Sequence, residues 1–195
     1  AAEDHEIVDD VKKNGGNAIL TSKNHKTGTD RIFEAFSLLN LKNIDLIMNI
    51  QGDEPQIDIK DIINLNNKMT ENQSKLGTLA SKISELKMLQ NENVVKVKIN
   101  QSFKKESFPS AKMFTRKTND KENIFHHIGI YCYEKNTLKN FVSLKQSQNE
   151  IKNKLEQLRA LDNNIKVNVA LANSSPIGVD TKEDFLALKK IMEYK

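Results

Sequence analysis

Residues 45–55 read Asp-Leu-Ile-Met-Asn-Ile-Gln-Gly-Asp-Glu-Pro, a short apolar run that stops at a polar glycine turn closed by a proline. The run is typical of a buried strand, and the turn carries two adjacent carboxylates, Asp53 and Glu54. In an open α/β sheet, ligands bind just beyond the carboxyl end of a strand. A carboxylate there can hold a hard cation such as Mg²⁺ against a phosphate. The alternative is an ordinary strand-to-helix turn in which Asp53 caps the next helix.

Helical and strand-like patterns alternate on both sides of this run. Apolar residues at helical spacing predict one helix before Gly15-Gly16, a second after a cap at Thr29 or Asp30, and a third over residues 59–69. The order helix, strand, helix, strand, helix favours an α/β fold with a mostly parallel sheet and helices on both faces. Short apolar runs predict the strands at residues 18–21, 46–50, 76–80, 94–99, 124–133 and 167–171.

Finer predictions concern the individual elements. Lys96 and Lys98 alternate with valine and isoleucine, which predicts that one face of their strand meets solvent. Residues 101–112, which include Pro109, are expected to form a loop outside the core, and Thr181 is expected to cap the last helix. The residues expected to face the core from their helices are Ile32, Phe33, Phe36 and Leu39, then Ile62, Ile63 and Leu65, and, on one longer helix, Ile151, Leu155, Leu158 and Leu161.

Composition limits the class of protein. The chain has 195 residues, of which 37% are hydrophobic and 29% charged, so it fits one globular domain. Its net charge is +4, but the lysines are scattered among acids without a basic run, which argues against a nucleic-acid partner. The single cysteine, Cys132, excludes an internal disulfide. No apolar stretch approaches the roughly 20 residues that cross a bilayer, and no signal peptide is visible, so we expect no membrane partner and a cytoplasmic location.

Five polar clusters, taken in order, resemble one known family. The clusters contain GTDR (28–31), NIQGDEP (49–55), HIGIYCY (127–133), KLEQLRAL (154–161) and GVDTKED (178–184). Together they resemble 3-deoxy-manno-octulosonate cytidylyltransferases, or CMP-Kdo synthetases, along essentially the whole chain. The resemblance implies a Rossmann-like nucleotidyltransferase fold with a small sugar-binding and dimerisation lobe. It also implies a cytoplasmic, Mg²⁺-dependent homodimer that joins CTP to the acid sugar Kdo, releasing pyrophosphate, for lipopolysaccharide synthesis.

The resemblance assigns roles to particular residues. Asp53 and Asp180 match the metal-binding and catalytic carboxylates, and two unpaired carboxylates close together would repel without a cation. The alternative is that both are independent helix caps. Residues that match the nucleotide-binding loop are Gly28, Thr29 and Arg31. Residues that match sugar-binding positions are Gln51, Arg116, His127, Tyr131, Glu156 and Gln157.

Several of these residues have a plainer alternative. Arg31 suits a phosphate but also an exposed first helical turn. His127 suits a hydrogen bond to the sugar rather than a general base, but it also suits a purely structural histidine. Glu156 and Gln157 point away from the leucine stripe, towards either a cleft or solvent. Arg116 ends Met-Phe-Thr-Arg, where the family usually has Tyr-Phe-Ser-Arg, so its match depends on the guanidinium alone.

One departure from the family concerns the start of the chain. The family begins with a strand and a loop whose Arg and Lys residues hold the triphosphate, and no such segment precedes Ala1. We therefore expect residues 1–195 to be a single nucleotidyltransferase domain without that strand and phosphate-binding loop, and a poor catalyst in this form. Two alternatives remain: a cytidylyltransferase for another acidic sugar, such as 8-amino Kdo or a sialic-type acid, or a non-catalytic fragment that binds a nucleotide or sugar.

Overall fold

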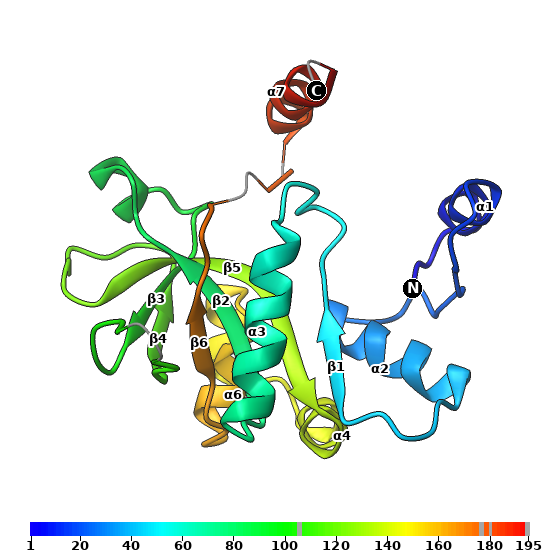
Figure 1. Ribbon diagram of the computed structural model, residues 1–195, viewed down its shortest axis with the longest axis horizontal. Coiled ribbons are helices and arrows are strands. Elements are labelled where there is room, and N and C mark those ends of the chain that lie inside the picture. The colour runs from blue at the N-terminus through cyan, green and yellow to red at the C-terminus, as the bar shows by residue number, and fades with distance from the viewer. Residues whose placement is uncertain (105–106, 176–177, 180, 194–195) are drawn as a thin grey trace.

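The computed structural model describes residues 1–104, 107–175, 178–179 and 181–193. Its helices are α1 (His5–Lys13), α2 (Gly28–Leu39), α3 (Ile59–Glu71), the 3₁₀ turn η1 (Leu86–Leu89), α4 (Lys135–Ser143), α5 (Gln148–Asn153), α6 (Leu158–Asp162) and α7 (Lys182–Glu193). Its strands are β1 (Leu46–Asn49), β2 (Leu76–Ser81), β3 (Lys96–Ile99), β4 (Ala111–Thr115), β5 (Ile124–Glu134) and β6 (Asn168–Leu171). Helices and strands alternate along the chain, so the predicted α/β class is confirmed (Figure 1).

The six strands form one sheet in the order β4-β3-β5-β2-β6, and β1 also pairs with β5. Because β5 is antiparallel to β1, β2 and β3, while β2 and β6 are parallel, the strands β1, β2, β3 and β6 share one direction. Among the described strands, however, β2 and β6 form the one parallel neighbouring pair. The prediction of a mostly parallel sheet is therefore right for strand direction and wrong for strand pairing. An apolar pattern indicates that a strand exists but not which way it runs.

Strand β5 separates two hydrophobic layers. Ile128, Ile130 and Cys132 pack with α3 on one face, where Leu65 and Met69 are buried. On the other face, residues of β5 pack with α4 and α6, and with partly buried residues of α2. Successive residues of a strand point to opposite faces, so one strand serves both layers. The predicted helices on both faces are confirmed (Figure 1).

A glycine lets α3 approach the sheet closely. A Cβ on Gly77 of β2 would lie 2.6 Å from Met69 Sδ and 3.0 Å from the Phe108 ring. Phe108 is 9% exposed and belongs to this layer, so part of residues 101–112, predicted to lie outside the core, contributes to it. Strand β4, which starts at Ala111, was not predicted either. Its lysine and polar neighbours hide the pattern of a strand in this segment.

Several predicted details are wrong. Residues 18–21 form no strand of the sheet, since Leu20 makes an isolated bridge with Ala2. Thr27, not Thr29 or Asp30, caps α2, because its hydroxyl accepts the Asp30 N–H while Gly28 and Thr29 are already helical. Leu39 and Ile63 are more than half exposed.

Two further corrections concern the second half of the chain. Lys96 was expected to face solvent, yet it is 0% exposed. The single helix predicted around residues 151–161 is instead two short helices, α5 and α6, separated at Lys154, whose φ of 52° is left-handed. A helix cannot continue through such a residue.

Helices α1 and α7 stand apart from the sheet in Figure 1. Thr181 caps α7 as predicted, since its hydroxyl accepts the Asp184 N–H at 3.1 Å. None of the helices in the described residues combines the length and the apolar character needed to span a bilayer.

Candidate active site

Most of the predicted site residues gather where β1 ends against β5, across from β2. In the sheet register, Tyr131 of β5 is opposite Asn49 on one side and Thr78 on the other. The β2–β5 register shifts between Thr78 and Leu79, so the ladder is irregular at this point. The site therefore lies at the carboxyl end of β1, the position expected for an open α/β sheet, and beside the first half of β2.

The first turn of α2 is attached to β5. Thr29 is 0% exposed, and its hydroxyl lies 3.2 Å from the Tyr133 hydroxyl. The cap at Thr27, two residues before Thr29, fixes the start of the helix. The predicted nucleotide-binding turn therefore has a fixed place beside the row of aromatic residues on β5.

Glu156 reaches the same place from the segment between α5 and α6. Burial raises the pKa of its carboxyl group, while the Thr29 hydroxyl and the Arg159 charge partly oppose that rise. Its Oε1 atom is buried without a hydrogen-bond partner. Burial also raises the pKa values of Tyr131 and Tyr133 well above the ordinary value, so both phenols stay protonated and can donate hydrogen bonds.

His127 is buried and neutral. Burial makes the larger contribution to lowering its pKa to about 3, and the charge of the neighbouring His126 adds to it. Its Nε2 lies 3.0 Å from the Thr78 hydroxyl, and that hydroxyl donates its own proton to the Ile130 carbonyl at 2.7 Å. Nε2 must therefore carry the ring proton, which leaves Nδ1 as an acceptor. This geometry and the lowered pKa suit hydrogen bonding and not general-base chemistry near neutral pH.

Gln51 links the end of β1 to α2. A Cβ on Gly28 would lie 3.0 Å from Gln51 Nε2, so glycine makes room for this amide. Gln51 Nε2 donates to Asn49 Oδ1 at 2.9 Å. Asn49 is 3% exposed and its Nδ2 has no hydrogen-bond partner. Asn49 was not predicted as a site residue, although it directly precedes Ile50 and Gln51 in the polar turn after β1.

Asp53 lies exposed in the turn after β1. Asp58, not Asp53, caps α3, because the Asp58 side chain accepts the Lys60 N–H at 2.9 Å. The alternative of a simple cap at Asp53 is therefore wrong. The Asp53 carbonyl accepts the Val179 N–H at 2.9 Å, so the turn meets the segment just before Asp180. Asp180 itself is outside the described residues. Within those residues, no group of three or more His, Cys, Asp or Glu side chains forms a metal site.

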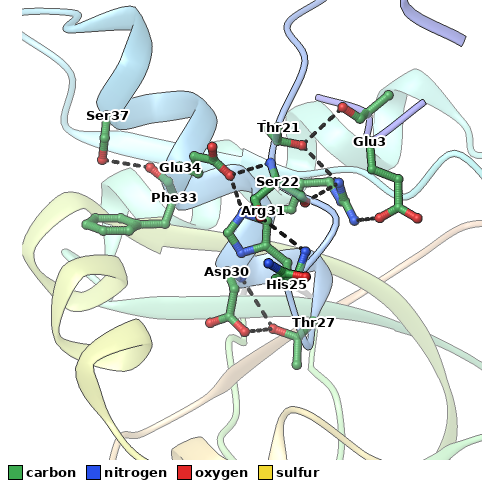
Figure 2. Close-up of polar contacts among 12 residues, drawn as sticks. Glu3, Thr21, Ser22, His25, Thr27, Asp30, Arg31, Phe33, Glu34 and Ser37 are labelled. Atoms are coloured by element: carbon green, nitrogen blue, oxygen red, sulfur yellow. Dashed lines mark hydrogen bonds and ion pairs between the residues drawn. The ribbon is translucent and has the colours of Figure 1, made fainter. Parts of the chain in front are cut away.

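The two predicted site arginines are both held by protein groups. Arg31 pairs with Glu3, donates to Thr21 Oγ1 at 2.9 Å and so ties the N-terminal segment to α2 (Figure 2). Arg116 donates to three backbone carbonyls. The structure thus brings neither guanidinium together with the Thr29–Glu156 group. Gln157, by contrast, is 6% exposed beside Glu156 and occupies the N-cap position of α6.

A buried ion pair lies next to the Thr29–Glu156 group. Arg159 is 1% exposed and binds Glu150 through two hydrogen bonds of 2.8 and 2.6 Å. Its guanidinium carbon lies 4.6 Å from the centre of the Phe141 ring, and Asp30 of α2 is 3.6 Å from Nη1. Arg159 was not predicted as part of the site. The sequence did carry a signal that Arg159 is buried: it follows Leu155, which was predicted to face the core, by four residues.

Comparison with known proteins agrees with this geometry. A family model described as cytidylyltransferase matches residues 1–167. The 3-deoxy-manno-octulosonate cytidylyltransferase of Thermodesulfovibrio yellowstonii is 38% identical over 203 residues, covering 98% of this chain and 80% of the relative. The enzyme of that name from Bartonella tribocorum is 37% identical over 195 residues, covering 98% and 79%.

The chain belongs to the 3-deoxy-manno-octulosonate cytidylyltransferase family. A solved structure of CMP:2-keto-3-deoxy-manno-octonic acid synthetase complexed with CTP superposes with a TM-score of 0.85 at 29% identity, covering 99% of this chain and 79% of that one. The predicted family and the predicted Rossmann-like nucleotidyltransferase fold are both confirmed. The enzyme class follows, because a cytidylyltransferase is one kind of nucleotidyltransferase.

Proposed function

We propose that this cytidylyltransferase joins CTP to Kdo, forming CMP-Kdo and pyrophosphate for lipopolysaccharide synthesis. One observation carries the proposal: the turn matched to nucleotide binding meets the residues matched to sugar binding. Thr29 lies 3.2 Å from Tyr133, beside Tyr131 and Glu156, and Gly28 packs on the Gln51 amide. Group transfer requires both substrates to be held side by side, and this contact supplies such a place.

In the proposed reaction the anomeric hydroxyl of Kdo attacks the α-phosphorus of CTP in line. The new bond joins that oxygen to phosphorus, the bond to the β-phosphate oxygen breaks, and the hydroxyl proton leaves to solvent. We propose Asp53 and Asp180 as ligands for Mg²⁺. An exposed carboxylate fits this role, because Mg²⁺ is usually bound by one or two carboxylates together with substrate phosphates. When bound, the cation offsets charge on the phosphate and on the attacking oxygen.

The chemistry of the buried side chains supports a sugar pocket. Tyr131 donates, His127 accepts through Nδ1, and the unpartnered Glu156 Oε1 accepts. Gln51 and Gln157 contribute amide groups that suit hydroxyls. On the nucleotide side, we assign Gly28 and Thr29 to the base edge and Arg31 to the phosphates, where it would exchange its pairing with Glu3 for the ligand.

Four further features are proposed from family membership. Residues 1–195 act as one nucleotidyltransferase domain, the enzyme is a homodimer, the second subunit packs through a small lobe, and the location is cytoplasmic. Light scattering after size-exclusion chromatography tests the assembly. A mass of two chains is expected, and a mass of one chain contradicts the homodimer.

A pyrophosphate-release screen of the complete protein tests the proposed activity. CTP, UTP and ATP are each combined with Kdo, 8-amino Kdo or a sialic acid, with Mg²⁺ and with excess chelator. We expect turnover with CTP, Kdo and Mg²⁺. If 8-amino Kdo or a sialic acid is preferred, that sugar replaces Kdo as the proposed substrate. If no pair of substrates gives turnover, the proposal that the protein is an enzyme is contradicted.

A further inference from the structure

Asp61, in the first turn of α3, is a buried carboxylate that binds the segment after β6. This segment is described at residues 173–175 and 178–179, and we call it the return segment. Asp61 is 0% exposed. Its Oδ1 accepts the backbone N–H and the side-chain Nδ2 of Asn173, each at 2.9 Å, and the Ser174 hydroxyl lies 3.5 Å from Oδ2. Because a buried carboxylate needs hydrogen bonds in place of water, these contacts hold helix and segment together.

Two further contacts hold the same stretch of chain. Asn64 lies three residues after Asp61, on the same face of α3, and its Nδ2 donates to the Leu171 carbonyl at 3.2 Å. From the sheet, Nδ1 of His126 in β5 lies 2.6 Å from the Ser175 hydroxyl. Burial is the main cause that lowers the pKa of His126 to about 4, so near pH 7 its ring is neutral and can accept that hydrogen bond. Residues 171–175 are therefore fixed between α3 and β5.

The far end of the return segment meets the turn after β1 (Figure 1). The Val179 N–H donates to the Asp53 carbonyl at 2.9 Å, and a Cβ on Gly178 would lie 3.7 Å from Glu54 Oε1. This turn leads directly into α3, so Asp53 and Asp61 belong to one short piece of chain. That piece therefore holds the return segment at two separate points.

We propose that Asp61 is a positioning residue which holds the return segment against the Asp53 turn and thereby supports the Mg²⁺ ligands of the proposed function. The proposed ligand Asp180 directly follows Val179 in the sequence. Because Mg²⁺ demands near-ideal geometry from few carboxylates, a small shift of one ligand should weaken its binding. The proposal rests on the proposed function for its effect on the metal. Its structural part, the attachment of the return segment, is tested without substrate or metal.

Binding of Mn²⁺, a spectroscopic substitute for Mg²⁺, distinguishes positioning from direct ligation. The complete protein is titrated with Mn²⁺ without nucleotide, and electron paramagnetic resonance measures the free ion. Asp61→Ala should weaken binding roughly tenfold, the lower end for residues that orient metal ligands. Asp61→Asn keeps an oxygen acceptor for Asn173 and offers a donor to the Ser174 hydroxyl, so it should stay within about threefold of the wild type. Equal losses in both variants would mean that the charge itself is needed, and they overturn the proposal.

Asp58→Ala is the matched control, because Asp58 caps the same helix three residues earlier. It should lower the midpoint of urea unfolding but leave Mn²⁺ binding within about twofold. A loss as large as that of Asp61→Ala would mean that a loosened α3 explains the effect, and it overturns the proposal. If Asp61→Ala folds poorly, Asn173→Ala combined with Ser174→Ala breaks the contacts from the side of the segment. This double variant should weaken Mn²⁺ binding at least roughly threefold, and unchanged binding overturns the proposal.

Amide hydrogen exchange, measured by NMR without substrate or metal, separates failure of this proposal from failure of the proposed function. Asp61→Ala should speed exchange of the Asn173 amide and also of the Val179 amide, each by roughly fivefold or more. Asp58→Ala should change neither. Faster exchange at Asn173 alone overturns the proposal, because the contact then acts only locally. A wild-type protein that binds no Mn²⁺, or that shows no turnover with CTP and Kdo, contradicts the proposed function and leaves this measurement valid.

Discussion

The two sides of the candidate site are built differently. On one side, Thr29, Tyr131 and Tyr133 are buried in the main hydrophobic layer, with Glu156 beside them and the Arg159–Glu150 pair behind. On the other side, Asp53 lies on an exposed turn that one backbone hydrogen bond joins to Val179. The proposed sugar side is part of the core, whereas the proposed metal side is assembled from surface loops. Changes on the first side should affect both stability and binding, and changes on the second should affect chemistry alone.

The largest expected effect tests the loop side. Asp53→Ala, or Asp180→Ala, in the complete enzyme should lower kcat by roughly 10³-fold or more, because several kcal/mol of charge stabilisation by Mg²⁺ is lost. The midpoint of urea unfolding should not change, since the Asp53 side chain is exposed. Turnover near the wild-type rate would remove the metal assignment. A large drop in the unfolding midpoint would remove the contrast between the two sides.

The next effect concerns the core side. Arg159→Ala leaves Glu150 buried without its partner, so we expect the free energy of unfolding to fall by about 3–5 kcal/mol. Urea denaturation measures the change. Glu85→Ala, which breaks the exposed Lys87–Glu85 pair, is the matched control and should have little effect. If both variants are equally stable, the buried Arg159–Glu150 pair contributes no more to the free energy of unfolding than the exposed pair does.

A pH dependence should also distinguish the core side. His127 has a pKa of about 3 in the folded protein and about 6.5 when unfolded, so the unfolded chain binds more protons between these values. Stability should therefore be complete above about pH 6.5 and fall as the pH drops, by up to about 1.4 kcal/mol per pH unit from this residue. His127→Gln should reduce that slope. Urea midpoints between pH 4.5 and 8 measure it, and identical slopes would contradict the buried, neutral histidine.

The smallest expected effect separates the two substrates. Gln157→Ala should raise the Michaelis constant for Kdo roughly tenfold, the loss of about one hydrogen bond, and change that for CTP less than twofold. Steady-state kinetics with each substrate varied in turn gives both values. An equal rise for both substrates would move Gln157 out of the sugar pocket.

The sequence predicted the parts of the fold that have a clear period. The apolar run along residues 124–133 predicted β5, the helical spacing after Asp58 predicted α3, and the apolar run before Gln51 predicted β1. The turn with Asp53 was found for the same reason, because a polar glycine turn after a strand is a local signal. Strand pairing was not predictable in this way, since β5 lies between strands far from it in the sequence.

The parts that were missed depend on contacts between distant segments. Lys96 alternates like a solvent-facing residue, but its ammonium group binds the carbonyls of Asn91 and Val94, in the loop just before β3, and the carbonyl of Arg116, which follows the distant strand β4. Lys154 carries no sequence mark of a left-handed turn, and the backbone groups that Arg116 binds are the same in every residue. The start of α5, by contrast, could have been predicted from the sequence, because Ser147 and Glu150 have the spacing of a capping box and form one.

Calorimetric titration of Kdo into the complete protein with excess chelator tests the central contrast most directly. If the sugar side is preformed in the core, Asp53→Ala should bind Kdo with the wild-type dissociation constant, within about twofold, while Glu156→Gln should bind roughly tenfold more weakly. If Asp53→Ala weakens Kdo binding as much as Glu156→Gln does, the two sides act as one unit and the account is contradicted.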